Sequence, residues 1–167
     1  MELRNYQIVA VESVSQFIQN NVGRNVKRAC LLQAPTGSGK TVMASSIIER
    51  NNNVIYLFVS PAKGGLSKQT FEKLNVWNEG VYYAEPSTIQ RVPYLQAGET
   101  IVIPWESVNK DGNVLVAEGE DRNLFDLLDA TAATGTEVVI IVDEAHLAKS
   151  VVTKAQAFLR RVEDTLG

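Results

Sequence analysis

Short runs of consecutive apolar residues recur along the chain, each bounded by polar or glycine-containing segments. Runs of this length without alternation are typical of strands buried on both faces, as in parallel sheets covered by helices. They lie at residues 29–32, 54–59, 100–103 and 138–142, with a shorter candidate at 81–83. The pattern therefore predicts a mostly parallel central sheet.

Between these runs, apolar side chains recur every three or four residues, as on one face of a helix. The first such segment, residues 4–22, carries Tyr6, Val9, Ala10, Val14, Phe17 and Ile18, and we expect it to pack on the sheet and to end at Gly23. Further helices are predicted at residues 42–48, 66–74, 118–129 and 153–166. Strands that alternate with helices indicate an α/β fold of three layers, with helices on both faces of the sheet.

Two segments are less regular. Ser87 is a candidate cap for residues 87–97, but Pro93 argues against an unbroken helix there. Residues 109–113 form a turn signal between apolar positions, which predicts a small hairpin excursion near residues 106–119. In residues 118–129, acidic side chains interleave with apolar ones, a pattern that favours a helix with an acidic outer face over a metal site.

Composition agrees with one domain of 167 residues, of which 45% are hydrophobic and 21% charged. No apolar run approaches membrane-spanning length and no signal-peptide pattern is present, so we expect no membrane contact and a cytoplasmic location. The net charge of −3 gives no broad basic surface, so any contact with nucleic acid must use a local groove or another domain. The single cysteine, Cys30, is expected to be a buried small side chain in the strand at 29–32.

Residues 34–41 carry the clearest chemistry. They read Ala-Pro-Thr-Gly-Ser-Gly-Lys-Thr and fit the phosphate-loop pattern G-x-x-x-x-G-K-S/T, with Ala34 in place of the first glycine. Glycines let the backbone turn its N–H groups toward a phosphate, and the following helix offers its positive end to the same anion. Lys40 can reach the terminal phosphates, and the Thr41 hydroxyl is a natural ligand for Mg²⁺. The candidate nucleotide-binding residues here are Thr36, Gly37, Ser38, Gly39, Lys40 and Thr41.

The alternative for this stretch is a solvated turn before a helix. An apolar strand candidate precedes the loop and a helical pattern follows it, which is the order that the phosphate-loop motif requires. A nucleoside triphosphate site is therefore the first hypothesis.

A polar pair, Arg4 and Gln7, stands at the start of the first predicted helix. A glutamine amide offers a donor and an acceptor together, which matches the edge of adenine. The alternative is a helix start with solvated polar groups, and the residues alone leave both interpretations open.

The carboxyl ends of two predicted strands carry candidates for nucleic-acid contact, because ligands of open α/β sheets bind beyond these ends. After residues 54–59, Lys63, the N–H groups of Gly64 and Gly65, and Gln69 can hold a phosphate backbone. The alternative is a surface loop with an incidental lysine. After residues 100–103, Trp105 either stacks on a base or packs on a neighbouring side chain, and packing is commoner for tryptophan.

Two carboxylates, Asp143 and Glu144, leave the apolar run at 138–142. Buried carboxylates are costly unless they act on a cation, so we expect Asp143 to hold Mg²⁺ and Glu144 to orient a water molecule. The alternative is a cap for the next helix. His146 is the only histidine and cannot build a zinc site without nearby cysteines. It is either a hydrogen-bonded link between the nucleotide site and another part of the protein or a structural side chain.

Four of these stretches resemble motifs of superfamily-two helicases and translocases. Residues 3–7 resemble the adenine-contacting Gln motif, 34–41 the Walker A loop, 60–69 the first nucleic-acid-contacting motif, and 143–146 the DEAH-type Walker B motif. Residues 104–110 and the order Ser-Pro-x-Lys-Gly-Gly-Leu-Ser from Ser60 are most similar to the motor subunit of type III restriction enzymes. The resemblance spans nearly the whole chain and implies a RecA-like lobe.

The resemblance implies a role for each matching residue. Arg4 and Gln7 would contact adenine, and the loop residues 36–41 would hold ATP and Mg²⁺. Asp143 would bind Mg²⁺, Glu144 would activate water, and Ser60, Lys63 and Gln69 would lie near the backbone of double-stranded DNA.

The resemblance also implies missing parts. Few residues follow His146, so the coupling motif, the second motor lobe with its arginine finger and a nuclease domain are expected elsewhere in a larger protein, with a methyltransferase subunit as a further partner. An RNA helicase lobe and a nucleotide-gated binding module without hydrolysis are the alternatives.

Overall fold

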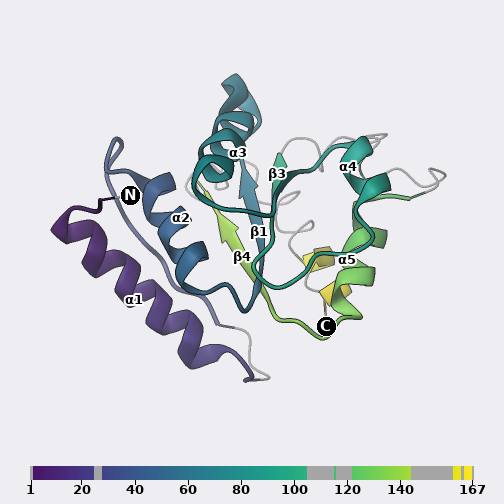
Figure 1. Cartoon of the computed structure of the whole chain (residues 1–167), viewed down its shortest axis with the longest axis horizontal. Coiled ribbons are helices and arrows are strands. Elements are labelled where there is room, and N and C mark those ends of the chain that lie inside the picture. The colour runs from purple at the N-terminus through teal and green to yellow at the C-terminus, as the bar shows by residue number, and fades with distance from the viewer. Residues whose placement is uncertain are drawn as a thin grey trace.

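A four-stranded parallel sheet forms the centre of the computed structural model (Figure 1), which describes residues 2–24, 28–104, 115, 122–143, 160–162 and 164–166. The strands are β1 (Ile55–Ser60), β2 (Val81–Tyr83), β3 (Thr100–Pro104) and β4 (Val138–Val142). Their order across the sheet is β2-β3-β1-β4, and every pair is parallel. The fold class is therefore the predicted one, an α/β domain with a parallel central sheet.

Helices cover both faces of this sheet, as Figure 1 shows, with α1 and α2 on one side and α4 and α5 on the other. They are α1 (Asn5–Asn21), α2 (Lys40–Arg50), α3 (Leu66–Trp77), α4 (Pro86–Arg91) and α5 (Leu124–Ala132), with a short 3-10 helix, η1 (Lys63–Gly65), before α3. The predicted strands at 54–59, 81–83, 100–103 and 138–142 and the predicted helices at 42–48 and 66–74 are confirmed, with small shifts of their ends.

Two hydrophobic cores lie on the two faces of the sheet, because neighbouring side chains of a strand point to opposite faces. In β1, Leu57 faces the core that holds α4 and α5, whereas Tyr56 and Phe58 face the core beneath α1, α2 and α3. Every residue of β1 is buried. This burial on both faces explains why the strand reads as an uninterrupted apolar run.

The packed face of the first helix agrees only in part with the predicted one, because Ala10, Val14 and Ile18 pack against the core as predicted but Tyr6 and Val9 do not. Its buried side chains are Gln7, Val11, Ser15 and Ile18, whereas Tyr6 and Val9 are 48% and 63% exposed. The prediction that α1 packs on the sheet is also wrong in detail, because α1 packs mainly against α2, which lies between α1 and the sheet in Figure 1. Two polar side chains, Gln7 and Ser15, lie on this buried face because each has hydrogen-bond partners. Gln7 bonds to the backbone of Arg4 and Ser38, and the Ser15 hydroxyl accepts from Asn51.

The strand predicted at residues 29–32 is not formed. This stretch has no regular structure and is exposed, with Leu31 at 84% and Leu32 at 41% exposure, and Cys30 is exposed instead of buried. A strand needs a neighbour for its backbone hydrogen bonds, and in the described part of the sheet no strand lies beside this stretch. Because residues 29–32 do not pair with it, β4 lies at the edge of the described sheet. Its residues are only half-buried, although its apolar run predicts burial on both faces.

Three smaller predictions have different outcomes. The helix predicted from residue 118 begins at Leu124, and the Asn123 side chain caps it by accepting hydrogen bonds from the N–H groups of Phe125 and Asp126. The acidic Asp126 and Asp129 of this helix are exposed, as expected. Ser87 does not cap α4, because Glu85 holds the cap position and Pro86 the first turn. The hairpin excursion near 106–119 lies outside the described residues, apart from Leu115.

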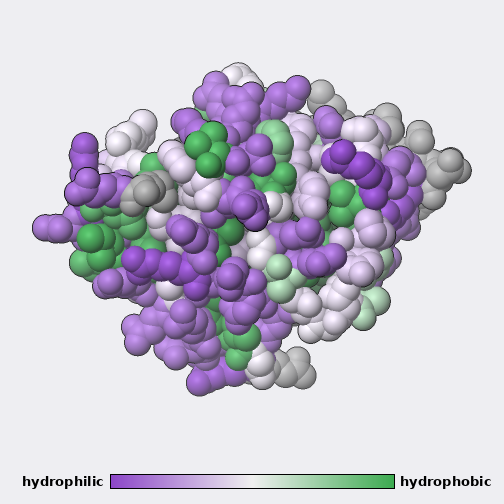
Figure 2. Space-filling view, in the orientation of Figure 1, coloured by the Kyte–Doolittle hydropathy of each residue, from purple (hydrophilic) through white to green (hydrophobic). Residues whose placement is uncertain are grey.

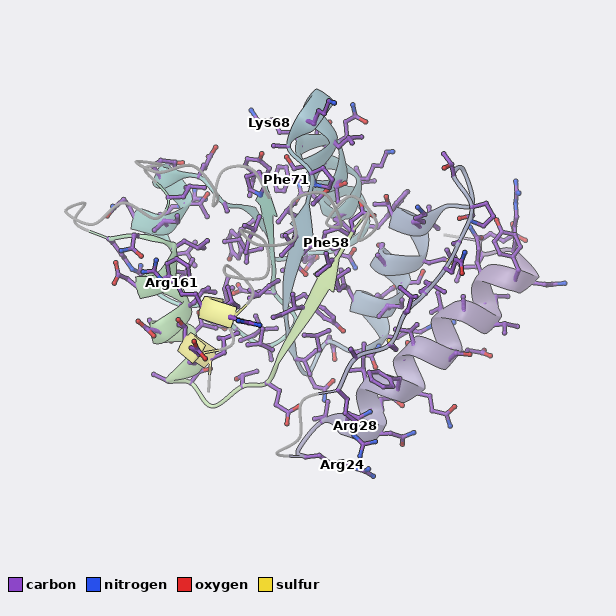
Figure 3. All side chains as sticks on the ribbon, turned by 180° about the vertical axis from the view of Figure 1, so that it is seen from behind. Arg24, Arg28, Phe58, Lys68, Phe71 and Arg161 are labelled. Carbon is purple, nitrogen blue, oxygen red and sulfur yellow. The ribbon has the colours of Figure 1, made fainter. Side chains whose placement is uncertain are left out.

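The last described residues pack against α5. Val162 is buried in the core that α5 shares with β1, and the guanidinium of Arg161 lies 3.8 Å from the centre of the Phe125 ring (Figure 3). The surface seen in Figure 2 is mostly hydrophilic, with separate hydrophobic groups between the polar ones. Within the described ranges, the structure contains no helix with the length and apolar character needed to cross a membrane.

Candidate functional site

Three segments meet at the carboxyl edge of the sheet. β1 and β4 are parallel and end side by side, with Val59 opposite Val142, so η1 and Asp143 follow at the same edge. α2 ends a few residues before β1 begins, so the last turn of α2 lies near the amino end of β1. The first residue of α2, Lys40, therefore lies toward the carboxyl edge of the sheet. Figure 1 shows the loop before α2 and the tip of β4 at the same end of the molecule. The fold thus gathers the predicted nucleotide residues at one edge.

The loop before α2 has the backbone that phosphate binding needs. Gly37 and Gly39 have φ angles of 79° and 82°, in the left-handed region that glycine adopts at little cost. Ser38 lies between them, and its N–H donates to the Pro35 carbonyl at 3.2 Å. Gly39 is the N-cap of α2, and its carbonyl accepts from the N–H of Met43. The loop therefore turns sharply into the start of a helix.

Three features of this loop fit a bound phosphate. The first turn of a helix has N–H groups without intrahelical partners and a positive end of the helix dipole. A Cβ placed on Gly37 would meet nothing within 4 Å, so there is open space beside the loop. The Ser38 hydroxyl is buried and has no hydrogen-bond partner within the described residues, which costs free energy that a ligand oxygen would offset. The residues present therefore fit a polyphosphate.

Two side chains from the start of α1 hold the loop. The Gln7 amide nitrogen and the Tyr6 hydroxyl both donate to the Ser38 carbonyl oxygen, at 2.9 Å and 3.0 Å. The amide oxygen of Gln7 accepts from the N–H of Arg4, the residue that caps α1, at 2.8 Å. Gln7 is 7% exposed, so its amide faces the loop and the helix cap, while Arg4 is exposed. The structure thus brings Gln7 to the loop at residues 36–39, and its contact with adenine stays a prediction.

Tyr6 is a site residue that the sequence did not single out. Its position in the helical pattern predicted a core side chain, yet its ring is half-exposed and its hydroxyl reaches the loop. The available signal was its chemistry, because a tyrosine next to a polar motif offers a hydroxyl donor that an aliphatic side chain lacks.

Asp143 directly follows β4 and is fixed by the sheet. Its N–H donates to the Val59 carbonyl at 2.9 Å, which continues the β1–β4 ladder by one residue, and the residue is half-buried. Thr41, in the first turn of α2, is also half-buried. In the described residues no three His, Cys, Asp or Glu side chains gather as a metal site. Mg²⁺ commonly takes one or two protein ligands together with phosphate oxygens and water, so Thr41 and Asp143 suit it without such a cluster.

The other rim candidates differ in accessibility. Lys63, Gly64 and Gln69 are exposed, which suits contact with a nucleic-acid backbone. Ser60 is 1% exposed and its hydroxyl has no partner in the described part of the chain, so it does not present its side chain at the surface. The Gly65 N–H donates to the Ala62 carbonyl at 3.0 Å and is already used within the turn. The remaining candidates, Trp105, Glu144 and His146, lie outside the described residues.

Comparison with known proteins agrees with this geometry. The model of the family described as type III restriction enzyme, res subunit, matches residues 1–164. No curated protein and no solved structure matches the chain.

Proposed function

Because the chain belongs to the family of type III restriction enzyme res subunits, whose shared domain is an ATP-dependent helicase-like motor, we propose that it is the ATP-binding lobe of a DNA translocase that drives a restriction endonuclease. The observation that carries this proposal is the loop at residues 36–41. It combines two glycines with a left-handed backbone, a buried hydroxyl that has no partner among the described residues, and the start of a helix. A turn of no function would not need all three.

Each residue of the site has a role in this proposal. Backbone N–H groups of the loop and the start of α2 hold the phosphates, and Lys40 neutralises the charge that develops on the terminal phosphate. The Thr41 hydroxyl and the Asp143 carboxylate hold Mg²⁺, which offsets negative charge on the phosphate oxygens when it is bound. Arg4 and Gln7 are proposed to contact the adenine base, and the bond from the Gln7 amide nitrogen to the Ser38 carbonyl supports this by keeping Gln7 beside the loop.

Hydrolysis requires a water molecule in line with the terminal phosphate. Glu144 follows Asp143 in the sequence, and we assign it the role of orienting and deprotonating this water. His146, two residues further on, is the proposed link from the nucleotide site to the DNA-contacting parts.

The proposed nucleic-acid partner is double-stranded DNA. Lys63, Gly64 and Gln69 are exposed on the rim where β1 ends, and Trp105, the residue after β3 in the sequence, is a further proposed contact. With a net charge of −3, the chain binds through this rim and not through a basic surface. A second motor lobe, a nuclease domain and a methyltransferase subunit are the further partners that this function needs.

Hydrolysis by this lobe alone should be slow. An arginine finger from a facing lobe contributes about 10³ to 10⁵ in rate in related phosphoryl transfer. We expect the chain to bind Mg²⁺-ATP weakly and to release phosphate slowly, without stimulation by DNA.

The test is phosphate release by the 167-residue chain with Mg²⁺-ATP, alone and with matched DNA and RNA duplexes. Slow turnover that Glu144→Gln removes, without loss of ATP binding, supports the proposal. Rapid DNA-stimulated turnover would contradict the need for a second lobe. ATP binding without phosphate release, in the wild-type chain as in Glu144→Gln, would favour a nucleotide-gated binding module. Phosphate release that the RNA duplex stimulates and the DNA duplex does not would favour an RNA helicase.

A further inference from the structure

Two neighbouring side chains of α1 converge on one backbone atom of the phosphate loop. The Tyr6 hydroxyl and the Gln7 amide nitrogen both donate to the Ser38 carbonyl oxygen, from a part of the chain more than thirty residues away. A carbonyl oxygen has two lone pairs and can accept both bonds at once. The loop is therefore fixed from outside at its central residue.

The loop needs such an anchor. Gly37 and Gly39 flank Ser38, and glycine has the largest backbone freedom of any residue. The Ser38 N–H donates to the Pro35 carbonyl at 3.2 Å, at the long end of the usual range, so this bond holds the turn only weakly. Ordering a loop at the moment of binding lowers affinity, and a loop that is already ordered avoids that cost.

The two donors are not equivalent. Gln7 also accepts from the Arg4 N–H and is buried, so it caps α1 and fills space beside Gly39. Tyr6 is 48% exposed, and the contact of α1 with α2 is made by other side chains, such as Val11 and Ile18. Its hydroxyl can therefore be removed with little effect on packing.

We propose that Tyr6 is a positioning residue that holds the phosphate loop in its binding conformation through the Ser38 carbonyl. This inference rests on the proposed function, because it gives the loop a polyphosphate to bind. Tyr6 acts on the backbone that surrounds the phosphates and not on the base. Its contribution is therefore the same for any ligand that carries the same polyphosphate.

The experiment compares Tyr6→Phe with the wild-type chain, and uses Tyr94→Phe as the matched control because Tyr94 is exposed to a similar degree, 43%. Isothermal titration with Mg²⁺-ATP and with Mg²⁺-tripolyphosphate, which has no base, measures both affinities. One hydrogen bond corresponds to about a two- to ten-fold change in dissociation constant. We expect Tyr6→Phe to weaken both ligands by a similar factor in that range, and Tyr94→Phe to change neither.

Amide hydrogen exchange gives a second measurement that does not depend on a ligand. Faster exchange at residues 36–39 in Tyr6→Phe, with unchanged exchange at residues 43–48 of α2, supports a positioning role. Equal affinities and equal exchange in Tyr6→Phe and the wild-type chain would overturn it. A loss confined to ATP would also overturn it, because that result assigns Tyr6 to the base.

The inference and the proposed function fail in different ways. If the wild-type chain binds neither ligand, or Lys40→Ala binds both as tightly as the wild-type chain, the proposed function and this inference both fall. If the wild-type chain binds, Lys40→Ala does not, and Tyr6→Phe behaves as the wild-type chain, only the inference about Tyr6 falls.

Discussion

The backbone of Gly39 lies against the side chain of Gln7. A Cβ built on Gly39 would stand 2.5 Å from the Gln7 amide nitrogen, closer than carbon and nitrogen can approach without movement. The same amide nitrogen donates to the Ser38 carbonyl, so the glycine and the glutamine are matched in shape and in hydrogen bonding. The start of α1 and the phosphate loop thus form one structural unit, although they are far apart in the sequence.

A substitution of Gly39 should disturb this unit more than a substitution of Gly37. Both glycines have a left-handed backbone, so alanine at either position carries a strain of about 1–3 kcal/mol. Only at Gly39 would the new Cβ also displace Gln7, because a Cβ at Gly37 has nothing within 4 Å. We expect Gly39→Ala to lower the free energy of unfolding in urea by more than Gly37→Ala. Equal losses would show that Gln7 does not pack against the loop in solution.

All four strands of the sheet were predictable from the sequence, including β2 and β4 at its edges. β1 is buried throughout and reads as an apolar run, and its prediction is confirmed. Residues 29–32 have the same apolar character, but a strand also needs a partner for its backbone, and residue types do not reveal whether one is present. The sequence also could not show that β4 lies at an edge.

The candidate site was predictable where chemistry fixes the spacing. The loop at residues 36–41 and the carboxylate after β4 follow from local patterns, because glycine conformation and strand ends are local properties. The anchor of the loop was not predictable, because the bond from Tyr6 to Ser38 joins two segments whose arrangement depends on the whole fold. The burial of Ser60 was missed because position on the rim does not determine exposure.

Arg122 should stabilise the end of α4. Its guanidinium donates to the carbonyls of Ile89, Val92 and Pro93, at the point where Pro93 prevents the helix from continuing. Removal of these charged donors leaves partly buried carbonyls without partners, so we expect Arg122→Ala to lower the free energy of unfolding by about 1–3 kcal/mol. Arg91→Ala, at an exposed position of the same helix, is the control and should change it by less than about 0.5 kcal/mol. Urea denaturation measures both, and equal effects would contradict the capping role.

Asn51 should join α1 to α2. Its buried amide nitrogen donates to the Ser15 hydroxyl at 3.0 Å and to the Ile47 carbonyl at 2.7 Å, and its amide oxygen accepts from Gln19 at 3.2 Å. We expect Asn51→Ala to cost about 1–3 kcal/mol of unfolding free energy, since it leaves buried polar groups unpaired. Asn53→Ala changes an exposed asparagine of the same turn and should be nearly neutral. If both substitutions have the same effect on thermal unfolding, this network does not hold the two helices together.

Stability should fall at alkaline pH. Burial raises the pKa of Tyr56, and burial together with the hydrogen bond and negative charge of Glu99 raises the pKa of Tyr82. Their neutral phenols are favoured in the folded chain, so this stabilisation is fully present below the unfolded value of about 10 and is lost as pH rises toward the folded values.

The measurement is urea denaturation of the wild-type chain and of Tyr56→Phe at several values between pH 9 and pH 11. We expect the unfolding free energy of the wild-type chain to decrease more steeply with pH than that of the variant, which lacks one titrating group. Parallel pH profiles would contradict the assignment to Tyr56.

The central claim is that residues 36–41 bind the phosphates of a nucleotide, and Lys40→Ala tests it most directly. Isothermal titration with Mg²⁺-ATP should give a weak but measurable affinity for the wild-type chain and for Lys73→Ala, which changes an exposed lysine of α3. The same titration of Lys40→Ala should give no measurable heat of binding, with an unchanged circular dichroism spectrum. ATP binding by Lys40→Ala with wild-type affinity would contradict the assignment of this loop as the nucleotide site.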